Sequence, residues 1–340
     1  MPQDLRFDLP FAAHANPQLA PAVPRHLQWL RSFGLLPAAD AEAQYLDWEF
    51  PALSGFWWPH ATGAELDLAL DAFAWMVLFD GQFDTALGMD AGRTRAAVDD
   101  MIAALRAPEA STAAAAPAAA AFRDLWNRER DGMTRPWHAR ATQNWQRCFE
   151  AFAAEAANRC GRRIPTPTAY DRIRDAAGYM PVLLDLSERV YRCEIPAAVH
   201  ETAVFRTLRK ATVRGCNYIE DLFSLHKEEV QGDPHNIVLV LEHHHRLTRP
   251  QAIDKAIGLV HFWTDTFLDA ESKVPAMLER LNAPAEVRGN VHRIVGNMRD
   301  NFAAAYTWTR TSPRYTNPAT RREDQPGYLG DILTPRHLTT

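Results

Sequence analysis

Residues 65–83 read ELDLALDAFAWMVLFDGQF. Apolar side chains recur in this stretch every three or four residues, which places them on one face of a helix. The series is Leu66, Leu70, Phe73 and Val77, with Asp80 at its end. The stretch therefore predicts an amphipathic helix of about five turns that ends in acidic residues.

The same helical spacing recurs along most of the chain. Further helices are predicted over Arg140–Ala157, Ala169–Val190, Ala198–Glu229, Pro250–Leu268 and Pro284–Thr311. Alternating runs that would indicate β-hairpins are missing, as are the glycine-rich loops of nucleotide-binding folds. We predict an all-α fold with one domain over residues 1–340. The irregular parts are expected at about 1–24, in the alanine-rich connector 110–121, and in a C-terminal lid or tail at about 311–340.

Composition excludes several classes of protein. The chain has 340 residues, 47% hydrophobic and 23% charged, as in ordinary globular proteins. A net charge of −5 argues against nucleic-acid binding, and no apolar run is long enough to span a membrane. The four cysteines form no CxxC pair, and the N-terminus lacks the apolar core of a signal peptide, so a cytoplasmic protein is expected. The run His243–His245 points in successive directions around a helix and is interpreted as solvated surface.

The first candidate site lies at the end of the quoted stretch. Asp80 and Asp84 are spaced i, i+4 and therefore share one helix face. They terminate an apolar run, which places them at the rim of a hydrophobic interior. Carboxylate oxygens of this kind suit Mg²⁺, which is usually shared with substrate phosphates. The alternative is a helix end with two solvated acids.

The second candidate site is a stripe of oxygen-bearing side chains. Glu220, Ser224 and Glu228 recur at i, i+4 and i+8, Asn217 lies on nearly the same face, and Lys227 follows beside the stripe. Such a stripe next to a lysine would hold a metal ion and an anionic phosphate together. The alternative is a charged outer face with i, i+4 pairing.

Together, the segments FDGQFD and EDLFSLHKE resemble the DDxx(x)D/E and (N/D)DxxSxx(K/R)E motifs of bacterial class I terpene synthases. Arg174, 46 residues before Glu220, matches the family's diphosphate-sensing arginine, and Gly178 matches the glycine of the helix break that follows it. Arg314 and Tyr315 match the C-terminal RY pair. The opening MPQDLRFDLPF and the stretch FWWPHATGAELDLAL are similar to sesquiterpene cyclases of the pentalenene synthase kind.

The resemblance implies a helical bundle around an apolar cavity and an enzyme of bacterial secondary metabolism. It implies that a linear isoprenoid diphosphate, first of all farnesyl diphosphate, is ionised and cyclised to a sesquiterpene hydrocarbon or alcohol with release of diphosphate. The alternatives are a diterpene cyclase acting on geranylgeranyl diphosphate, a prenyl diphosphate synthase, and a non-catalytic helical scaffold. A homodimer is left open.

The resemblance also implies roles for individual residues. Three Mg²⁺ ions, with Mn²⁺ as a substitute, would bind Asp80, Asp84, Glu220, Ser224 and Glu228, with Asn217 as the alternative to Glu220. The diphosphate would be bound by Arg174, Lys227, Arg314 and Tyr315. Aromatic faces stabilise cations, and the candidates to face the reacting chain are Phe73, Phe79, Phe83, Tyr179, Phe302 and above all Trp308. The alternative for each of them is ordinary core packing.

Two positions depart from the family motifs. Gly81 stands where the family usually has aspartate, and Glu220 where it usually has asparagine or aspartate. Because that aspartate usually pairs with the arginine of the RY dipeptide, Arg314 is expected to lack a partner, with Glu220 supplying the compensating charge. A glycine inside a helix costs up to about 1 kcal/mol relative to alanine, so a packing or shape reason is expected for Gly81.

Overall fold

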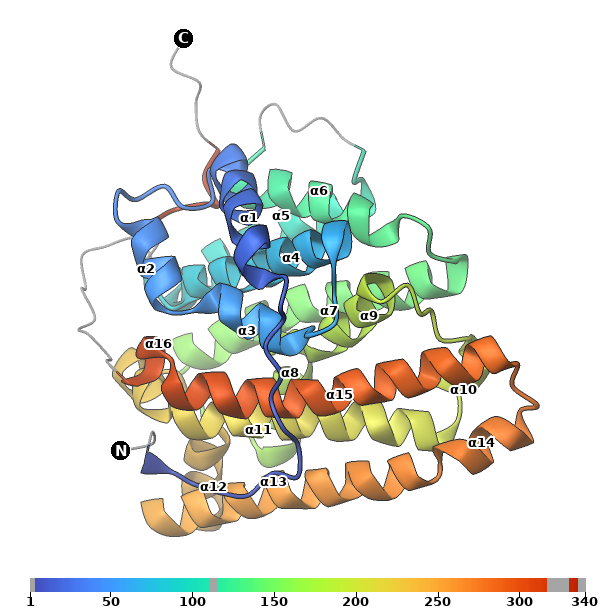
Figure 1. Ribbon diagram of the computed structural model, residues 1–340. Helices are drawn as coiled ribbons and strands as arrows, with labels where there is room; N and C mark the ends of the chain where they lie inside the picture. The colour runs from blue at the N-terminus through green and yellow to red at the C-terminus, as the bar shows by residue number, and fades with distance from the viewer. Residues whose placement is uncertain (1–3, 110–114, 317–329, 336–340) are drawn as a thin grey trace.

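The computed structural model describes residues 4–109, 115–316 and 330–335 (Figure 1). The rest of the predicted connector and tail, 110–114, 317–329 and 336–340, lies outside the described residues. In the part that is described, every regular element is a helix, which confirms the all-α prediction. The first half contains α1 (Leu19–Phe33), α2 (Ala41–Asp47), α3 (Phe50–Trp57), α4 (Gly63–Phe83), the 3₁₀-helix η2 (Ala86–Met89), α5 (Ala91–Arg106), α6 (Pro117–Arg130) and α7 (Arg135–Cys160). The second half contains α8 (Pro167–Ala177), α9 (Met180–Val190), α10 (Ala197–His200), α11 (Ala203–Gln231), α12 (Ile237–His245), α13 (Arg249–Ser272), α14 (Val274–Arg280), α15 (Ala285–Thr311) and α16 (Pro313–Thr316).

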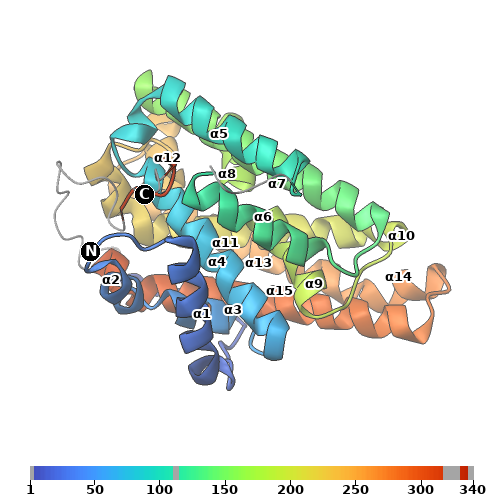
Figure 2. The same ribbon diagram turned by 90° about the horizontal axis from the view of Figure 1, so that it is seen from above.

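The helix formed by the quoted stretch, α4, lies in the interior. It contacts α1, α3, α6 and α9, and Figure 2 shows it between the N-terminal helices and α6. Leu68, Ala69 and Trp75, which lie off the predicted apolar stripe, are therefore buried as well. A helix that is apolar on nearly all sides is one that neighbours surround. The amphipathic pattern thus identified the helix but understated its burial.

The long helix α11 forms the second structural axis. It contacts both α13 and α15, and the three helices run side by side in Figure 1. The N-terminal segment crosses them: the ring of Phe7 lies 4.7 Å from that of Tyr306, and Phe11 lies 5.2 Å from Phe302, measured between centroids. One large cluster of buried apolar side chains extends from Phe7 to Ile332, and a small one consists of Ala151, Ile173 and Ala177.

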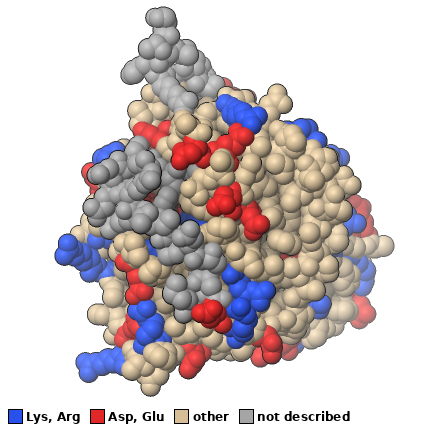
Figure 3. Space-filling model, turned by 60° about the vertical axis from the view of Figure 1, so that its left-hand side comes forward, with Lys and Arg blue, Asp and Glu red and all other residues tan. Residues whose placement is uncertain are grey.

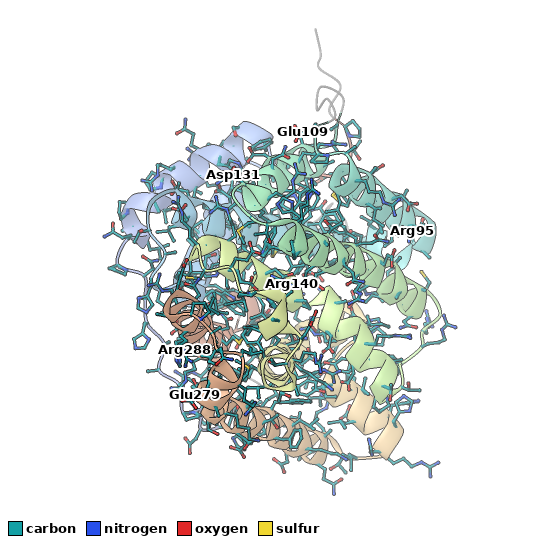
Figure 4. All side chains as sticks on the ribbon, turned by 90° about the vertical axis from the view of Figure 1, so that its right-hand side faces the viewer. Arg95, Glu109, Asp131, Arg140, Glu279 and Arg288 are labelled. Atoms are coloured by element: carbon teal, nitrogen blue, oxygen red, sulfur yellow. The ribbon has the colours of Figure 1, made fainter. Side chains whose placement is uncertain are left out.

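Buried ion pairs anchor α9 to its neighbours. Arg140 of α7, labelled in Figure 4, donates to Asp185 Oδ1 at 3.0 Å and to Glu188 Oε2 at 2.7 Å. Arg209 of α11 donates to the same Asp185 oxygen at 2.8 Å. Because both carboxylates are buried, these charge-assisted bonds fix α9 between α7 and α11.

Some predicted boundaries were wrong. The irregular N-terminal segment ends at residue 18, because α1 begins at Leu19 and contains Pro24. Pro24 is the sixth residue of this helix and therefore lacks one interior backbone hydrogen bond, whereas Pro21 stands among the first N–H groups, which have no acceptor within the helix. The alanine-rich connector likewise becomes helical at Pro117, a favourable first helical residue. The predicted helix Ala169–Val190 is two helices, and the break at residues 178–179 falls where the resemblance placed a helix-break glycine, Gly178.

Acidic and basic side chains are interspersed on the face shown in Figure 3. The side chains of His243–His245 are exposed, as expected, and all four cysteines are free. Among the helices of the described chain, none is both long and apolar enough to cross a bilayer.

Candidate active site

A cavity with an empty volume of about 780 Å³, including the part open to solvent, lies between α3, α4, α11, α15 and the α8–α9 break. Its walls are apolar, and they include Phe50, Leu53, Trp57, Phe73, Met76, Val77, Met180, Leu183, Cys216 and Ala305. Charged and polar side chains predicted from the sequence gather among the lining residues: Asp80, Arg174, Glu220, Arg314 and Tyr315. The cavity therefore combines an apolar interior with charged groups from four separate helices.

The acids at the end of α4 face cations from two other elements. Lys227 Nζ of α11 lies 2.9 Å from Asp84 Oδ2. The Arg314 guanidinium of α16 lies 3.6 Å from the same oxygen and 3.8 Å from Asp80 Oδ2. Burial raises the pKa of Asp80 to about 7, and the neighbouring Asp84 adds to the shift. Although burial acts to lower the pKa of Lys227, Asp84 raises it, so the ammonium form is favoured.

Glu220 joins the predicted sensor arginine to the RY pair. Its carboxylate forms an ion pair with Arg174 and accepts a hydrogen bond from Tyr315 Oη at 2.8 Å. Arg174 also donates through Nε to Asp221 Oδ1 at 2.9 Å. Burial opposes ionisation of Glu220, but Arg174 and Tyr315 together lower its pKa to about 2. Glu220 is therefore a carboxylate at neutral pH.

The other two members of the α11 stripe, Ser224 and Glu228, are held by hydrogen bonds inside the helical bundle. Ser224 Oγ donates to Glu228 Oε1 at 2.9 Å, and Asn236 Nδ2 donates to Glu228 Oε2 at 2.6 Å. Burial raises the pKa of Glu228 well above its usual value, with the nearby Asp221 adding to the shift. Asp221 is completely buried and also accepts a hydrogen bond from Tyr170.

Half of the predicted aromatic residues line the cavity. Phe73, Tyr179 and Trp308 do so, and Trp308 is fixed because its Nε1 donates to Trp48 O at 3.1 Å and its ring stacks on Phe50. The expectation that Phe79, Phe83 and Phe302 also line it is not met.

The neighbours of these rings explain the difference. Lining residues Phe73, Met76, Val77 and Asp80 occupy one face of α4. Phe79 lies on another face of α4, and Phe83 lies one turn beyond Asp80; both pack on Phe152 of α7, with ring centroids 5.4 and 4.7 Å apart. Phe302 points away from the cavity toward Phe11 and Phe267.

Comparison with known proteins identifies this arrangement. Residues 71–263, which include both acidic segments, match the family model described as terpene synthase family 2, C-terminal metal binding. The chain belongs to the terpene synthases. It is 31% identical to a pentalenene synthase of Streptomyces avermitilis over 98% of this chain and 99% of the relative. It is 32% identical to a (−)-β-caryophyllene synthase of Saccharothrix espanaensis, described as cyclising (2E,6E)-farnesyl diphosphate, over 98% and 94% of the two chains.

Solved structures agree with the family assignment. A variant of cucumene synthase superimposes with a TM-score of 0.81 and 35% identity, covering 91% of this chain and all of that one. The predicted fold and the prediction of a class I terpene cyclase are confirmed.

The donor set of this terpene synthase fits a divalent metal, as the family description implies. The two partly exposed carboxylates at the end of α4 and the carboxylate and hydroxyl oxygens on α11 are hard oxygen ligands, which suit Mg²⁺. Asp80 carries a raised pKa partly because Asp84 is close, a repulsion that a cation would relieve. Within the described ranges, no three acidic, histidine or cysteine side chains converge on one point. Each α4 acid and Glu220 is instead engaged with a cation or donor of the same site.

At the two positions that depart from the terpene synthase motifs, Gly81 and Glu220, the contacts differ from those that the sequence suggested. Arg314 does not lack acidic neighbours, because Asp80 and Asp84 lie beside it. Glu220 is engaged by Arg174 and Tyr315, so its charge is matched locally. Among the described residues, a Cβ atom at Gly81 would meet nothing within 4 Å, so they supply no packing reason for this glycine.

Sequence reasoning missed parts of the site that carry no motif. Asp221 and Asn236 hold Arg174 and Glu228, and Phe50, Trp57 and Cys216 line the cavity. Asp221 could have been found, since it is an acid inside a helix beside buried apolar neighbours. The lining residues are ordinary core residues in sequence, and only the packing of the helices shows which of them border a void.

Proposed function

We propose that this terpene synthase ionises farnesyl diphosphate and cyclises the resulting cation to a sesquiterpene hydrocarbon or alcohol. One observation carries the proposal: Arg174, Arg314 and Tyr315 line the charged end of an apolar cavity, and Lys227 lies beside Arg314 on the same oxygen of Asp84. Such a site suits a ligand with an anionic head and a hydrocarbon tail. The choice of farnesyl diphosphate is supported by the relative whose description names that substrate.

The diphosphate head would exchange partners with the protein's own acids. In the described structure Arg174 and Tyr315 bind Glu220, and Lys227 binds Asp84. A diphosphate would accept the same charge-assisted hydrogen bonds, which suit phosphate oxygens as well as carboxylates. The freed carboxylates of Asp80, Asp84, Glu220 and Glu228, with the Ser224 hydroxyl, would hold three Mg²⁺ ions, with Mn²⁺ as a substitute. Bound metal would neutralise the leaving diphosphate.

Ionisation breaks the allylic C–O bond, and the electron pair leaves with the diphosphate. Arg174, Lys227 and Arg314 stabilise the charge that develops on that group. The allylic cation remains in the cavity, where the apolar walls exclude water. The π-faces of Phe73 and Trp308 would stabilise it by about 0.5–2 kcal/mol each. Attack by a double bond of the chain closes the ring, and loss of a proton or addition of water ends the reaction.

We also infer that residues 1–340 form a single catalytic domain. The inference is supported by the apolar cluster that extends from Phe7 to Ile332, since a second domain would have a core of its own.

The test is incubation of the purified chain with farnesyl diphosphate and Mg²⁺, followed by gas chromatography and mass spectrometry of the hexane extract. A cyclic C15 hydrocarbon or alcohol is expected. Asp80→Asn should abolish it, whereas Asp99→Asn, an exposed acid of α5 paired with Arg95, serves as the matched control and should not. A longer isoprenoid diphosphate would reveal a chain-elongating enzyme. Turnover of geranylgeranyl diphosphate alone would reveal a diterpene cyclase.

A further inference from the structure

The break between α8 and α9 forms part of the cavity wall. Gly178 and Tyr179 lie between the two helices, and both line the cavity. Tyr179 takes up the left-handed conformation, with φ of 57°, whereas Gly178 has φ of −71° and ψ of 11°. Any residue can adopt the backbone angles of Gly178. The backbone conformation therefore does not explain why residue 178 is a glycine.

The contact of Gly178 with Asn217 of α11 explains it. Asn217 is 3% exposed and also lines the cavity. Its Nδ2 donates to the backbone oxygen of Arg174 at 3.1 Å. Its Oδ1 lies against Gly178, because a Cβ atom there would be 2.5 Å from Oδ1 and 3.1 Å from the oxygen of Arg174. Real Cβ atoms essentially never come within 3.0 Å of another heavy atom in such contacts. Gly178 and Asn217 are thus a matched pair.

The contact acts on the predicted diphosphate sensor. Arg174 is bound at both ends: its guanidinium reaches Glu220 and Asp221, and its carbonyl oxygen accepts from Asn217. Asn217 lies one turn before Glu220, so it was the alternative metal ligand. Its amide nitrogen is committed to α8, and its oxygen faces the glycine. Ser224 and Glu228, further along the same helix, bond to each other instead.

We propose that Asn217 is a positioning residue and not a metal ligand: it docks the end of α8 on α11 and thereby fixes Arg174 and the cavity wall at Gly178. The proposal rests on the proposed function for its substrate, the isoprenoid diphosphate. It assigns to Asn217 and Gly178 the control of how the isoprenoid chain folds in the cavity. A looser break would allow several folded chains to react, and the product would become a mixture.

The experiment compares Asn217→Ala, Gly178→Ala and the double variant in the full chain. Asn217→Ala should lower kcat about five- to tenfold, as expected for one lost hydrogen bond. It should add products to the chromatogram and leave the half-saturating Mg²⁺ concentration unchanged. Gly178→Ala should cost about a hundredfold, because its methyl group displaces the break. In the double variant the amide is gone, so kcat should exceed that of Gly178→Ala by about tenfold.

Ser224→Ala provides the matched comparison on the same helix, and it should raise the half-saturating Mg²⁺ concentration about tenfold. A similar rise in Asn217→Ala would make Asn217 a metal ligand and overturn the proposal, as would additive effects in the double variant. The same double-mutant cycle can be measured without turnover, from the midpoint of thermal unfolding. A midpoint that recovers in the double variant supports the pairing, and additive losses refute it. If the wild-type chain makes no cyclic C15 product, the proposed function fails, while this second cycle still decides on the pair.

Discussion

Replacing Glu129 by glutamine should increase the free energy of unfolding, and the gain should grow as the pH rises. Glu129 lies on α6 and is 1% exposed. Its Oε2 accepts a hydrogen bond from Trp145 Nε1 at 3.0 Å, whereas Oε1 is buried without a hydrogen-bond partner. Burial raises the pKa of this carboxyl from 4.5 to about 7. Glutamine keeps the acceptor for Trp145 and carries no charge.

The magnitude follows from linkage between protonation and folding. Below pH 4.5 the carboxyl is protonated in both states, and ionisation has no effect on stability. Between pH 4.5 and about 7 the folded state keeps a proton that the unfolded state has lost, so the free energy of unfolding falls as pH rises. A shift of this size corresponds to a full penalty of about 3 kcal/mol above pH 7, of which about 2.5 kcal/mol develops between pH 5 and pH 8.

The assay is urea unfolding at pH 5 and pH 8, followed by circular dichroism at 222 nm. The advantage of Glu129→Gln over the wild type should grow by about 2.5 kcal/mol between the two pH values. Glu150→Gln, at an exposed position of α7, controls for the loss of a charge and should show no such growth. An advantage of Glu129→Gln that is the same at both pH values would refute the reasoning.

Two predictions concern the catalytic charges. Arg174→Lys keeps the charge, but a lysine cannot reach Glu220 and Asp221 together. The value of kcat/KM with farnesyl diphosphate should therefore fall at least about hundredfold. Activity within a factor of about two of the wild type would show that Arg174 does not bind the diphosphate. Gly81→Asp and Glu220→Asn act on different partners, because Glu220 is engaged by Arg174 and Tyr315, while a Cβ atom at Gly81 would meet no described residue within 4 Å. Their effects on kcat/KM should therefore add within about 0.5 kcal/mol, and a larger coupling energy would restore the idea of a charge exchange between the two positions.

Local features of the site follow from the sequence because they depend only on the helical repeat. Asp80 and Asp84 share one face of α4, and Ser224 and Glu228 are close enough to bond, since residues four apart are neighbours on any α-helix. The order of the acidic segments, Arg174 and the RY pair along the chain was sufficient to indicate the terpene synthases, which the comparisons confirm.

Contacts between helices were decided only by the tertiary structure. The sequence could not show that Phe73 borders the void while Phe79, also apolar and aromatic, packs against α7. It could not show that Lys227 reaches Asp84 or that Asn217 requires a glycine at position 178. The helical repeat fixes where side chains lie around one helix axis, whereas the angle and depth at which two helices pack depend on all the side chains between them. The sequence therefore determined which residues this enzyme has available, and the packing of α4, α11 and the α8–α9 break determined which of them meet.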